Sequence, residues 1–320
     1  MAYYLGVEIK DEALSFLYGR SKCGHLYVLD EEEFALESGM ICNGVIKNRE
    51  GLRALLIQLL DKKKWYPEGT SILISPHCVM RREIYMPKFM ENHIEAYLAT
   101  YPEEWMDQAL QDYVFTAHRM TGTSEHRSTT YNIVESKRED RGKGRERRSK
   151  NVRQTSKGLE TDRARYCLVG SMKAAIIGPY HLFKELKCAP NFISTPLDVA
   201  LYSIEDSKEE HYQMLLLEAN GEWYVGIYEG GICILTFILP SRDKEKLLLE
   251  VGKLLQFYTF KYGDRQIEKC YVIWQGVRDQ AFEGAIEDTF ELEVVSLENN
   301  VSVNSLLMGS GKRAFIRRAL

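Results

Sequence analysis

The chain has 320 residues, of which 45% are hydrophobic and 28% charged, and its net charge is −4. This composition is typical of a globular protein with room for two domains, and the small negative charge gives no general attraction to nucleic acid. The longest uncharged apolar run, over residues 232–239, is far shorter than the roughly 20 residues of a membrane-spanning helix. The N-terminus lacks the basic region of a signal peptide, so we expect a cytoplasmic protein.

Metal, disulfide and catalytic chemistry find little support in the sequence. The seven cysteines are widely spaced and include no CxxC pair, and most lie in apolar surroundings, which predicts reduced thiols in the core. The seven histidines have no metal-ligand spacing. We therefore predict no metal site and no catalytic residue.

The first part of the chain predicts a three-stranded meander followed by a helix and a strand. The helix, over residues 48–64, carries leucines at helical spacing and has Asn48 as its N-cap. The four strands are predicted over residues 3–9, 13–18, 25–29 and 71–75.

The same order of elements recurs later. Residues 213–240 predict three strands with turns at Asn220-Gly221 and Gly230-Gly231. A helix capped by Ser241 runs to Tyr262, and a strand follows over residues 270–274. A duplicated unit of this kind predicts two similar halves that face each other across a cleft.

The region between the halves does not repeat this order of elements. Strands are predicted over residues 80–86, 111–119, 129–134, 166–170 and 191–194, and helices over residues 89–100, 174–186 and 197–204.

Residues 137–165 contain 12 basic and 5 acidic residues and almost no apolar ones. Such a segment cannot bury enough surface to offset the entropy of ordering it, so we predict a disordered loop. Its charge favours contact with anionic lipid, nucleic acid or an acidic partner. The alternative is a solvated insertion without such a role.

Two carboxylates, Glu8 and Glu218, occupy matching places in the two halves. In a nucleotide site between two domains, such carboxylates hold Mg²⁺ and glycine turns donate backbone N–H groups to phosphates. The turn after Glu8 has no glycine and carries Asp11 and Glu12, whereas Asn220 and Gly221 follow Glu218. Ordinary hairpins are therefore favoured over a phosphate site, and no cofactor is expected, although ATP with Mg²⁺ remains the alternative.

Three stretches in a fixed order carry a family resemblance, over residues 39–60, 71–87 and 166–200. With the duplicated pattern, they resemble the actin-like ATPase superfamily, and within it the PilM proteins of type IV pilus assembly, which are related to FtsA and to the cytoplasmic part of GspL. The resemblance implies an α/β, actin-like (duplicated ribonuclease-H-like) fold with two lobes and a small inserted α+β domain. Residues 1–75 and 166–205 would form the first lobe, residues 76–165 the insert and residues 206–320 the second lobe.

The resemblance also places the family's nucleotide elements, which are degenerate here. Glu8 and Glu218 stand where the family has aspartate, Asn220 and Gly221 stand in the second phosphate loop, and only Gly276 remains of an adenosine-side Gly-Gly pair. The strand that enters the insert carries Arg82, Ile84 and Pro87, which match the family's Arg-x-Ile-x-Leu-Pro motif and imply contact with a partner.

The resemblance implies a non-catalytic scaffold in a type IV pilus or related secretion platform. Its partner would be the cytoplasmic N-terminal peptide of a PilN-type inner-membrane protein, which would hold the chain at the inner membrane; self-association is left open. An extended peptide needs a groove and backbone pairing rather than hydrolysis. The alternatives are an ATP-binding switch or slow ATPase, and a module that binds anionic membrane or nucleic acid through residues 137–165.

Overall fold

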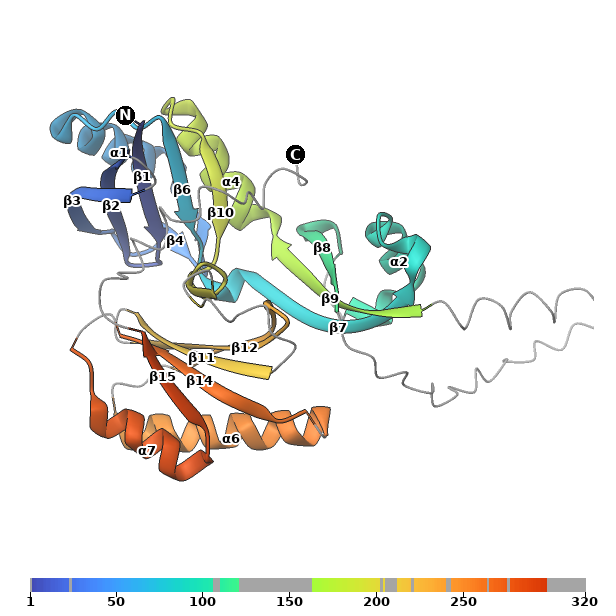
Figure 1. Cartoon of the computed structure of the whole chain (residues 1–320). Helices are drawn as coiled ribbons and strands as arrows, with labels where there is room; N and C mark the ends of the chain where they lie inside the picture. Colours follow the sequence, from blue (N-terminus) through green and yellow to red (C-terminus); the bar gives the residue numbers. More distant parts are fainter. Residues whose placement is uncertain are drawn as a thin grey trace, which may run out of the picture.

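The computed structural model describes residues 2–22, 25–105, 110–120, 163–201, 204, 212–219, 222–239, 243–263, 265–274 and 277–297. Over these residues the chain forms two five-stranded sheets, each with helices on one face, and a three-stranded sheet that projects to one side (Figure 1). We call the first two units the first and second lobe, and the third the insert.

The sheet of the first lobe has the strand order β10-β6-β1-β2-β3. The strands β1 to β3 form an antiparallel meander, and β6 and β10 add parallel to β1. Their bounds are Ala2–Ile9 for β1, Ala13–Lys22 for β2, His25–Ala35 for β3, Gly69–Leu73 for β6 and Pro190–Ser194 for β10. The small β4 (Ile41–Cys42) and β5 (Val45–Ile46) pair with each other.

The sheet of the second lobe repeats this topology with the order β13-β12-β11-β14-β15. Again three strands form an antiparallel meander, and two more add in parallel. The bounds are Tyr212–Ala219 for β11, Glu222–Glu229 for β12, Ile232–Leu239 for β13, Ile267–Ile273 for β14 and Glu293–Leu297 for β15. The repeated order confirms the two similar halves that the sequence predicts.

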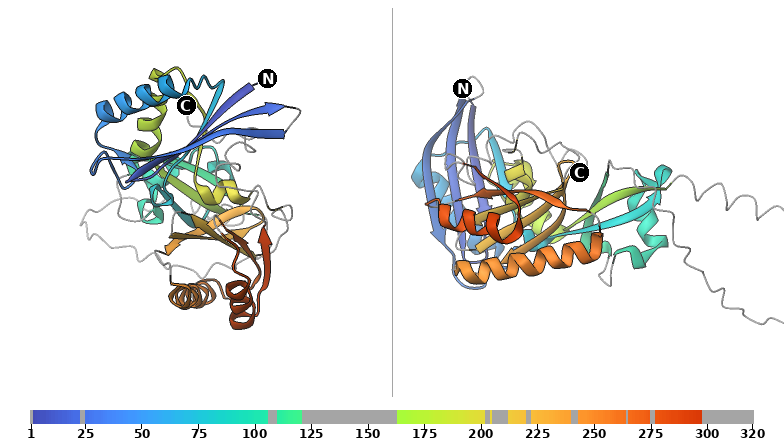
Figure 2. Two further views of the ribbon diagram at one scale, coloured as in Figure 1. Left: turned by 90° about the vertical axis from the view of Figure 1, so that its left-hand side faces the viewer. Right: turned by 60° about the horizontal axis from the view of Figure 1, so that its bottom comes forward.

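Helices cover one face of each sheet. In the first lobe they are α1 (Arg49–Lys63), whose N-cap is Asn48 as predicted, and α4 (Lys173–Glu185). In the second lobe α6 (Lys244–Tyr262) and α7 (Gln280–Phe290) lie side by side on the sheet (Figure 2). The N-cap of α6 is Asp243 rather than the predicted Ser241, because the Asp243 carboxylate accepts hydrogen bonds from the N–H groups of Glu245 and Lys246.

The insert follows β6 and a 3₁₀ turn over Pro76–Cys78. Its sheet has the antiparallel order β7-β9-β8, with β7 over Val79–Pro87, β8 over Tyr113–Arg119 and β9 over Arg163–Met172. Short helical segments over Lys88–Met90, Ile94–Thr100 (α2), Pro102–Trp105 and Leu110–Asp112 accompany it, in place of the single helix predicted over residues 89–100. The break follows from His93, whose backbone is not helical and which caps α2.

The predicted end of the insert at residue 165 falls inside β9. This strand pairs with β7 from Arg163 opposite Pro87 to Ser171 opposite Val79, and with β8 as far as Met172, so residues 166–172 join the insert's sheet rather than the first lobe. Residues 163–165, which the sequence analysis places at the end of a disordered loop, are strand. The rest of that loop and the predicted strand over residues 129–134 lie outside the described residues.

An apolar interface joins the two lobes. The short helix α5 (Pro196–Ala200) packs its Leu197 and Val199 against residues of the second sheet, among them Leu215 and Tyr228. The Tyr228 hydroxyl, which is buried, donates a hydrogen bond of 2.9 Å to the Leu197 carbonyl. The lobes therefore share a continuous core on the side of the sheets that faces away from α6.

Five of the six cysteines that the structure describes are buried thiols, as predicted; Cys42 is exposed and Cys23 lies outside the described residues. None of the helices in the described ranges has both the length and the apolar character needed to cross a bilayer. Within the same ranges, no cluster of three or more His, Cys, Asp or Glu side chains could hold a metal ion.

Candidate functional site

The first corner, by which we mean the end of β1 and the turn to β2 (residues 8–12), is built around a buried carboxylate. Glu8 is 4% exposed, and the Lys10 ammonium lies 3.4 Å from its Oε2. The same ammonium donates a hydrogen bond of 2.8 Å to the Ser15 hydroxyl and one of 3.1 Å to Glu33. Lys10 therefore neutralises the buried carboxylate beside it.

Asp11 is also engaged within the chain. Its two carboxylate oxygens accept hydrogen bonds of 2.7 and 2.8 Å from the backbone N–H groups of Asn43 and Gly44. Asn43 and Gly44 both have positive φ, and they form the turn between β4 and β5. The carboxylate thus orders a neighbouring turn, and it would repel a phosphate placed at this corner.

In the second lobe, the corresponding corner is lined by aromatic rings. Glu218 is half-buried at the end of β11 and lies opposite Trp223 in the β11–β12 ladder. The Trp223 ring packs against Trp274 and Phe282, with centroid distances of 5.1 and 5.4 Å. The predicted site residues Asn220, Gly221 and Gly276 lie outside the described residues.

A buried carboxylate supports this aromatic cluster. Glu283 accepts a hydrogen bond of 2.7 Å from the Trp274 indole, and Arg278 donates to both of its oxygens at 2.8 to 3.1 Å. Burial alone would raise the pKa of Glu283, but the hydrogen bonds from Arg278 and Trp274 outweigh it and lower the pKa. Glu283 is therefore a charged structural group in the second lobe.

The two lobes approach each other at Tyr224. Burial raises the pKa of its phenol, and the nearby charges of Glu8, from the opposite lobe, and of Glu222 raise it further. The described residues between the corners therefore present acidic and aromatic groups to one another. Because ATP needs cations and backbone N–H groups around its phosphates, these residues fit Mg²⁺–ATP poorly.

The insert is joined to both lobes by ion pairs. Arg165 of β9 pairs with Glu229 of β12, and both side chains are almost fully buried. Arg265, which precedes β14, donates to both oxygens of Glu83 at 2.7 and 3.2 Å.

On the other side, Arg81 of β7 donates hydrogen bonds of 2.6 and 2.7 Å to the carboxylate of Asp198 in α5. The Arg81 side chain is 2% exposed, and the Thr195 hydroxyl also donates to this carboxylate. Through Arg81, Glu83 and Arg165 the insert is held to α5 and to the second lobe.

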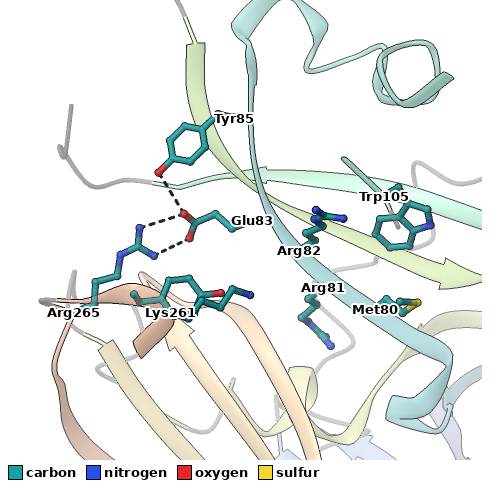
Figure 3. A pocket seen from close by; sticks show the side chains of 9 residues that line it. Met80, Arg81, Arg82, Glu83, Tyr85, Trp105, Lys261 and Arg265 are labelled. Atoms are coloured by element: carbon teal, nitrogen blue, oxygen red, sulfur yellow. Dashed lines mark hydrogen bonds and ion pairs between the residues drawn. The ribbon is translucent and has the colours of Figure 1, made fainter. Parts of the chain in front are cut away.

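A pocket of about 540 Å³ lies between β7 and the C-terminal end of α6 (Figure 3). Most of its wall comes from consecutive residues of β7, so it follows the direction of that strand. The Glu83 carboxylate is occupied by Arg265 and also accepts a hydrogen bond of 3.4 Å from Tyr85. The lining residues are Met80, Arg81, Arg82, Glu83, Tyr85, Trp105, Lys261, Tyr262 and Arg265.

Two cations of this pocket, Arg82 and Lys261, form no ion pair with any of the residues that the structure describes. The Lys261 ammonium lies over the rings of Phe257 and Tyr262. Burial lowers the pKa of Lys261, and the positive charge of Arg82 lowers it further, while Glu83 acts in the opposite direction. The pocket therefore holds two neighbouring positive charges.

The three predicted partner-binding residues lie in different surroundings. Arg82 lines the pocket, Ile84 is 1% exposed in the core of the insert, and Pro87 ends β7 in a half-buried position. Sequence reasoning missed Lys261 and Arg265, which lie on the other wall. Arg265 is 182 residues from Glu83 in the chain, and no local pattern signals a pairing over that separation.

No protein-family model matches the sequence, and no curated protein matches it either. Among solved structures, the chain is similar to a PilM–PilN type IV pilus biogenesis complex, at a TM-score of 0.65 and 13% identity, over 96% of this chain and 97% of the other. With the duplicated strand order, this match decides the fold. The chain has the two-lobed, actin-like ATPase fold.

A second neighbour is a component of a secretion system. The cytoplasmic domain of EpsL, an inner-membrane component of the type II secretion system of Vibrio cholerae, matches at a TM-score of 0.54 and 10% identity, over 98% of this chain and 97% of the other. A Bacteroides thetaiotaomicron protein with actin-like ATPase fold and unknown function is also similar, at a TM-score of 0.48 and 13% identity, over 96% of each chain.

Proposed function

We propose that this chain is a PilM-like, non-catalytic scaffold in the assembly platform of a type IV pilus or related secretion machine. Its partner would be the cytoplasmic N-terminal peptide of a PilN-type inner-membrane protein, and this contact would hold the chain at the inner membrane. The observation that carries the proposal is the match, over nearly the whole of both chains, to a complex of PilM with PilN.

The first corner supports a role without ATP turnover. Glu8 is paired with Lys10, and Asp11 is bonded to two backbone N–H groups. Binding Mg²⁺–ATP there would require these groups to give up their partners, and for the buried Glu8 the loss of its partner costs about 1–3 kcal/mol. Both the degenerate nucleotide elements of the sequence and these internal bonds support a role without ATP turnover.

The ion pairs of the insert support a rigid scaffold. A nucleotide-driven rearrangement of the lobes would pull Arg165 away from Glu229 and Arg81 away from Asp198. A charge that stays buried after losing its partner costs about 3–5 kcal/mol. A protein whose task is to present a fixed binding surface gains from such restraints.

The partner is tested by pull-down. The full chain is immobilised and offered the N-terminal cytoplasmic peptide of the co-encoded PilN-type protein, with a scrambled peptide of the same composition as control. Retention of the native peptide alone is the expected result. Equal retention of both peptides, or of neither, contradicts the proposal.

The ATP-binding alternative is tested separately, by titrating a fluorescent ATP analogue with Mg²⁺ into the full chain. No saturable binding is expected. Micromolar binding that is lost in the Glu218→Ala variant would show that the chain is a nucleotide switch instead of a non-catalytic scaffold.

A further inference from the structure

The pocket between β7 and α6 has an excess of cations and hydrogen-bond donors that the scaffold role does not explain. Its one carboxylate, Glu83, is bonded to Arg265 and Tyr85. The cations Arg82 and Lys261 have no carboxylate within ion-pair distance among the described residues. Two more donors of lining residues, Nη1 of Arg81 and Nε1 of Trp105, are buried without an acceptor there. Among the described side chains of the pocket wall, hydrogen-bond donors therefore outnumber acceptors.

Bringing two positive charges close together in a partly desolvated site is unfavourable. The direction of the Lys261 pKa agrees with this: burial is the main cause of the lowered value, the charge of Arg82 adds to it, and Glu83 opposes it. A bound anion would remove the penalty and gain charge-assisted hydrogen bonds from both side chains. The ligand that suits the pocket is therefore negatively charged.

The shape of the pocket narrows the kind of ligand. Residues 80–83 and 85, all from β7, line one wall, and β7 is an edge strand of the insert's sheet. Its outer edge has no strand partner within the described residues, and such an edge accepts an extended peptide through main-chain hydrogen bonds. Tyr262 and Tyr85 add aromatic surface for the side chains of that peptide.

We infer that the pocket beside β7 is a docking site for an acidic peptide in extended conformation, whose Asp or Glu carboxylate lies between Arg82 and Lys261. The peptide would come from a protein partner, and this inference rests on the proposed scaffold function. Recognition would then depend on one carboxylate of the peptide and on two cations of this chain, one from the insert and one from the second lobe. The partner would thereby bridge the two units.

The test uses a displayed library of random 12-residue peptides, panned on the full wild-type chain. The same library is panned on a variant with Arg82→Gln and Lys261→Gln, which keeps most of both side-chain stems. A control variant carries Lys62→Gln and Lys187→Gln, which remove two exposed lysines far from the pocket. All three proteins are first checked for equal thermal stability.

The expected result is a set of enriched peptides with Asp or Glu at one fixed position, on the wild type and the control but not on the pocket variant. Changing that residue to Asn or Gln in a synthetic consensus peptide should weaken binding at least tenfold, because charge-assisted hydrogen bonds are lost. Enrichment without an acidic position, equal enrichment on the pocket variant, or no enrichment overturns the inference.

Vesicles of phosphatidylglycerol form a further arm. If they bind the wild type and lose binding in the pocket variant, the cations face a membrane and the peptide inference is wrong. The outcome is separable from the scaffold proposal: retention of the PilN-type peptide with equal affinity by wild type and pocket variant removes the acidic site and leaves the scaffold. An acidic consensus without retention of the PilN-type peptide would keep the acidic site and contradict the proposed partner.

Discussion

At the first corner, Glu8, Lys10 and Asp11 are satisfied by groups of the chain itself, whereas Arg82 and Lys261, which both line the pocket beside β7, form no ion pair with the described residues. Charges that pair internally stabilise the fold and are unavailable to a ligand. Charges that lack a partner contribute nothing to folding and lower the free energy of a complex with an oppositely charged ligand. We therefore assign a structural role to the charges of the corner and a binding role to the cations of the pocket. Four experiments compare charges that are paired inside the protein with these two cations.

The largest effect is expected at the joint between the insert and the second lobe. Arg165→Ala leaves Glu229, whose side chain is 3% exposed, as an uncompensated buried charge. We expect a loss of about 3–5 kcal/mol in the free energy of unfolding, measured by chemical denaturation. Arg163→Ala is the matched control, because Arg163 is exposed in the same strand and should change stability by less than about 0.5 kcal/mol. Equal effects of the two variants would show that the Arg165–Glu229 pair does not hold the insert.

At the first corner, Lys10→Met removes the cation beside Glu8 and the donor to Ser15. The buried carboxylate then lacks this partner, so we expect the free energy of unfolding to fall by about 1–3 kcal/mol. Lys62→Met, at an exposed position of α1, serves as control. A Lys10→Met protein as stable as the control would mean that the corner is not closed by internal pairing.

The second lobe provides a test through pH. Hydrogen bonds lower the pKa of Glu283 in the folded protein below its ordinary value of 4.5. Its contribution to stability is therefore complete above pH 4.5 and is lost as the pH falls through the lower, folded-state pKa. Glu283→Gln should lower stability at neutral pH by about 1 kcal/mol and flatten the acid limb of the stability curve.

Asp288→Asn is the matched control for this measurement, because Asp288 is an exposed carboxylate on the same helix without an ion pair among the described residues. It should reproduce the wild-type curve of unfolding free energy against pH. If Glu283→Gln keeps the full acid limb, the bonds from Arg278 and Trp274 contribute no stability.

The sequence predicted the repeated strand order because both meanders consist of short apolar runs separated by turns of glycine and polar residues. It placed the end of β3 at residue 29, whereas the strand continues to Ala35 through a run of acidic residues. Such residues disfavour strands locally, but Lys63 pairs with Asp30 and Glu32, and Lys10 pairs with Glu33. The lysines come from elsewhere in the chain, so no local pattern could reveal them.

The site was less predictable than the fold for the same reason. Glu8 and Arg82 were identified from motif positions, but their surroundings depend on side chains that are distant in sequence. Arg165 looked like the end of a charged loop, because a run of basic residues precedes it, and only the pairing of β9 with β7 brings it to Glu229. Strands missed at the C-terminus, such as β15, are short and half-buried and therefore have weak periodicity.

The smallest effect on stability is expected at the pocket. In the variant with Arg82→Gln and Lys261→Gln, no ion pair among the described residues is lost and the repulsion between two cations disappears. The free energy of unfolding should therefore change by less than about 0.5 kcal/mol, in the same denaturation assay in which Lys10→Met is costly. A loss above about 1 kcal/mol would mean that these cations are paired inside the protein. Pocket and corner would then be alike, and the positive charge beside β7 would be part of the fold instead of a recognition surface.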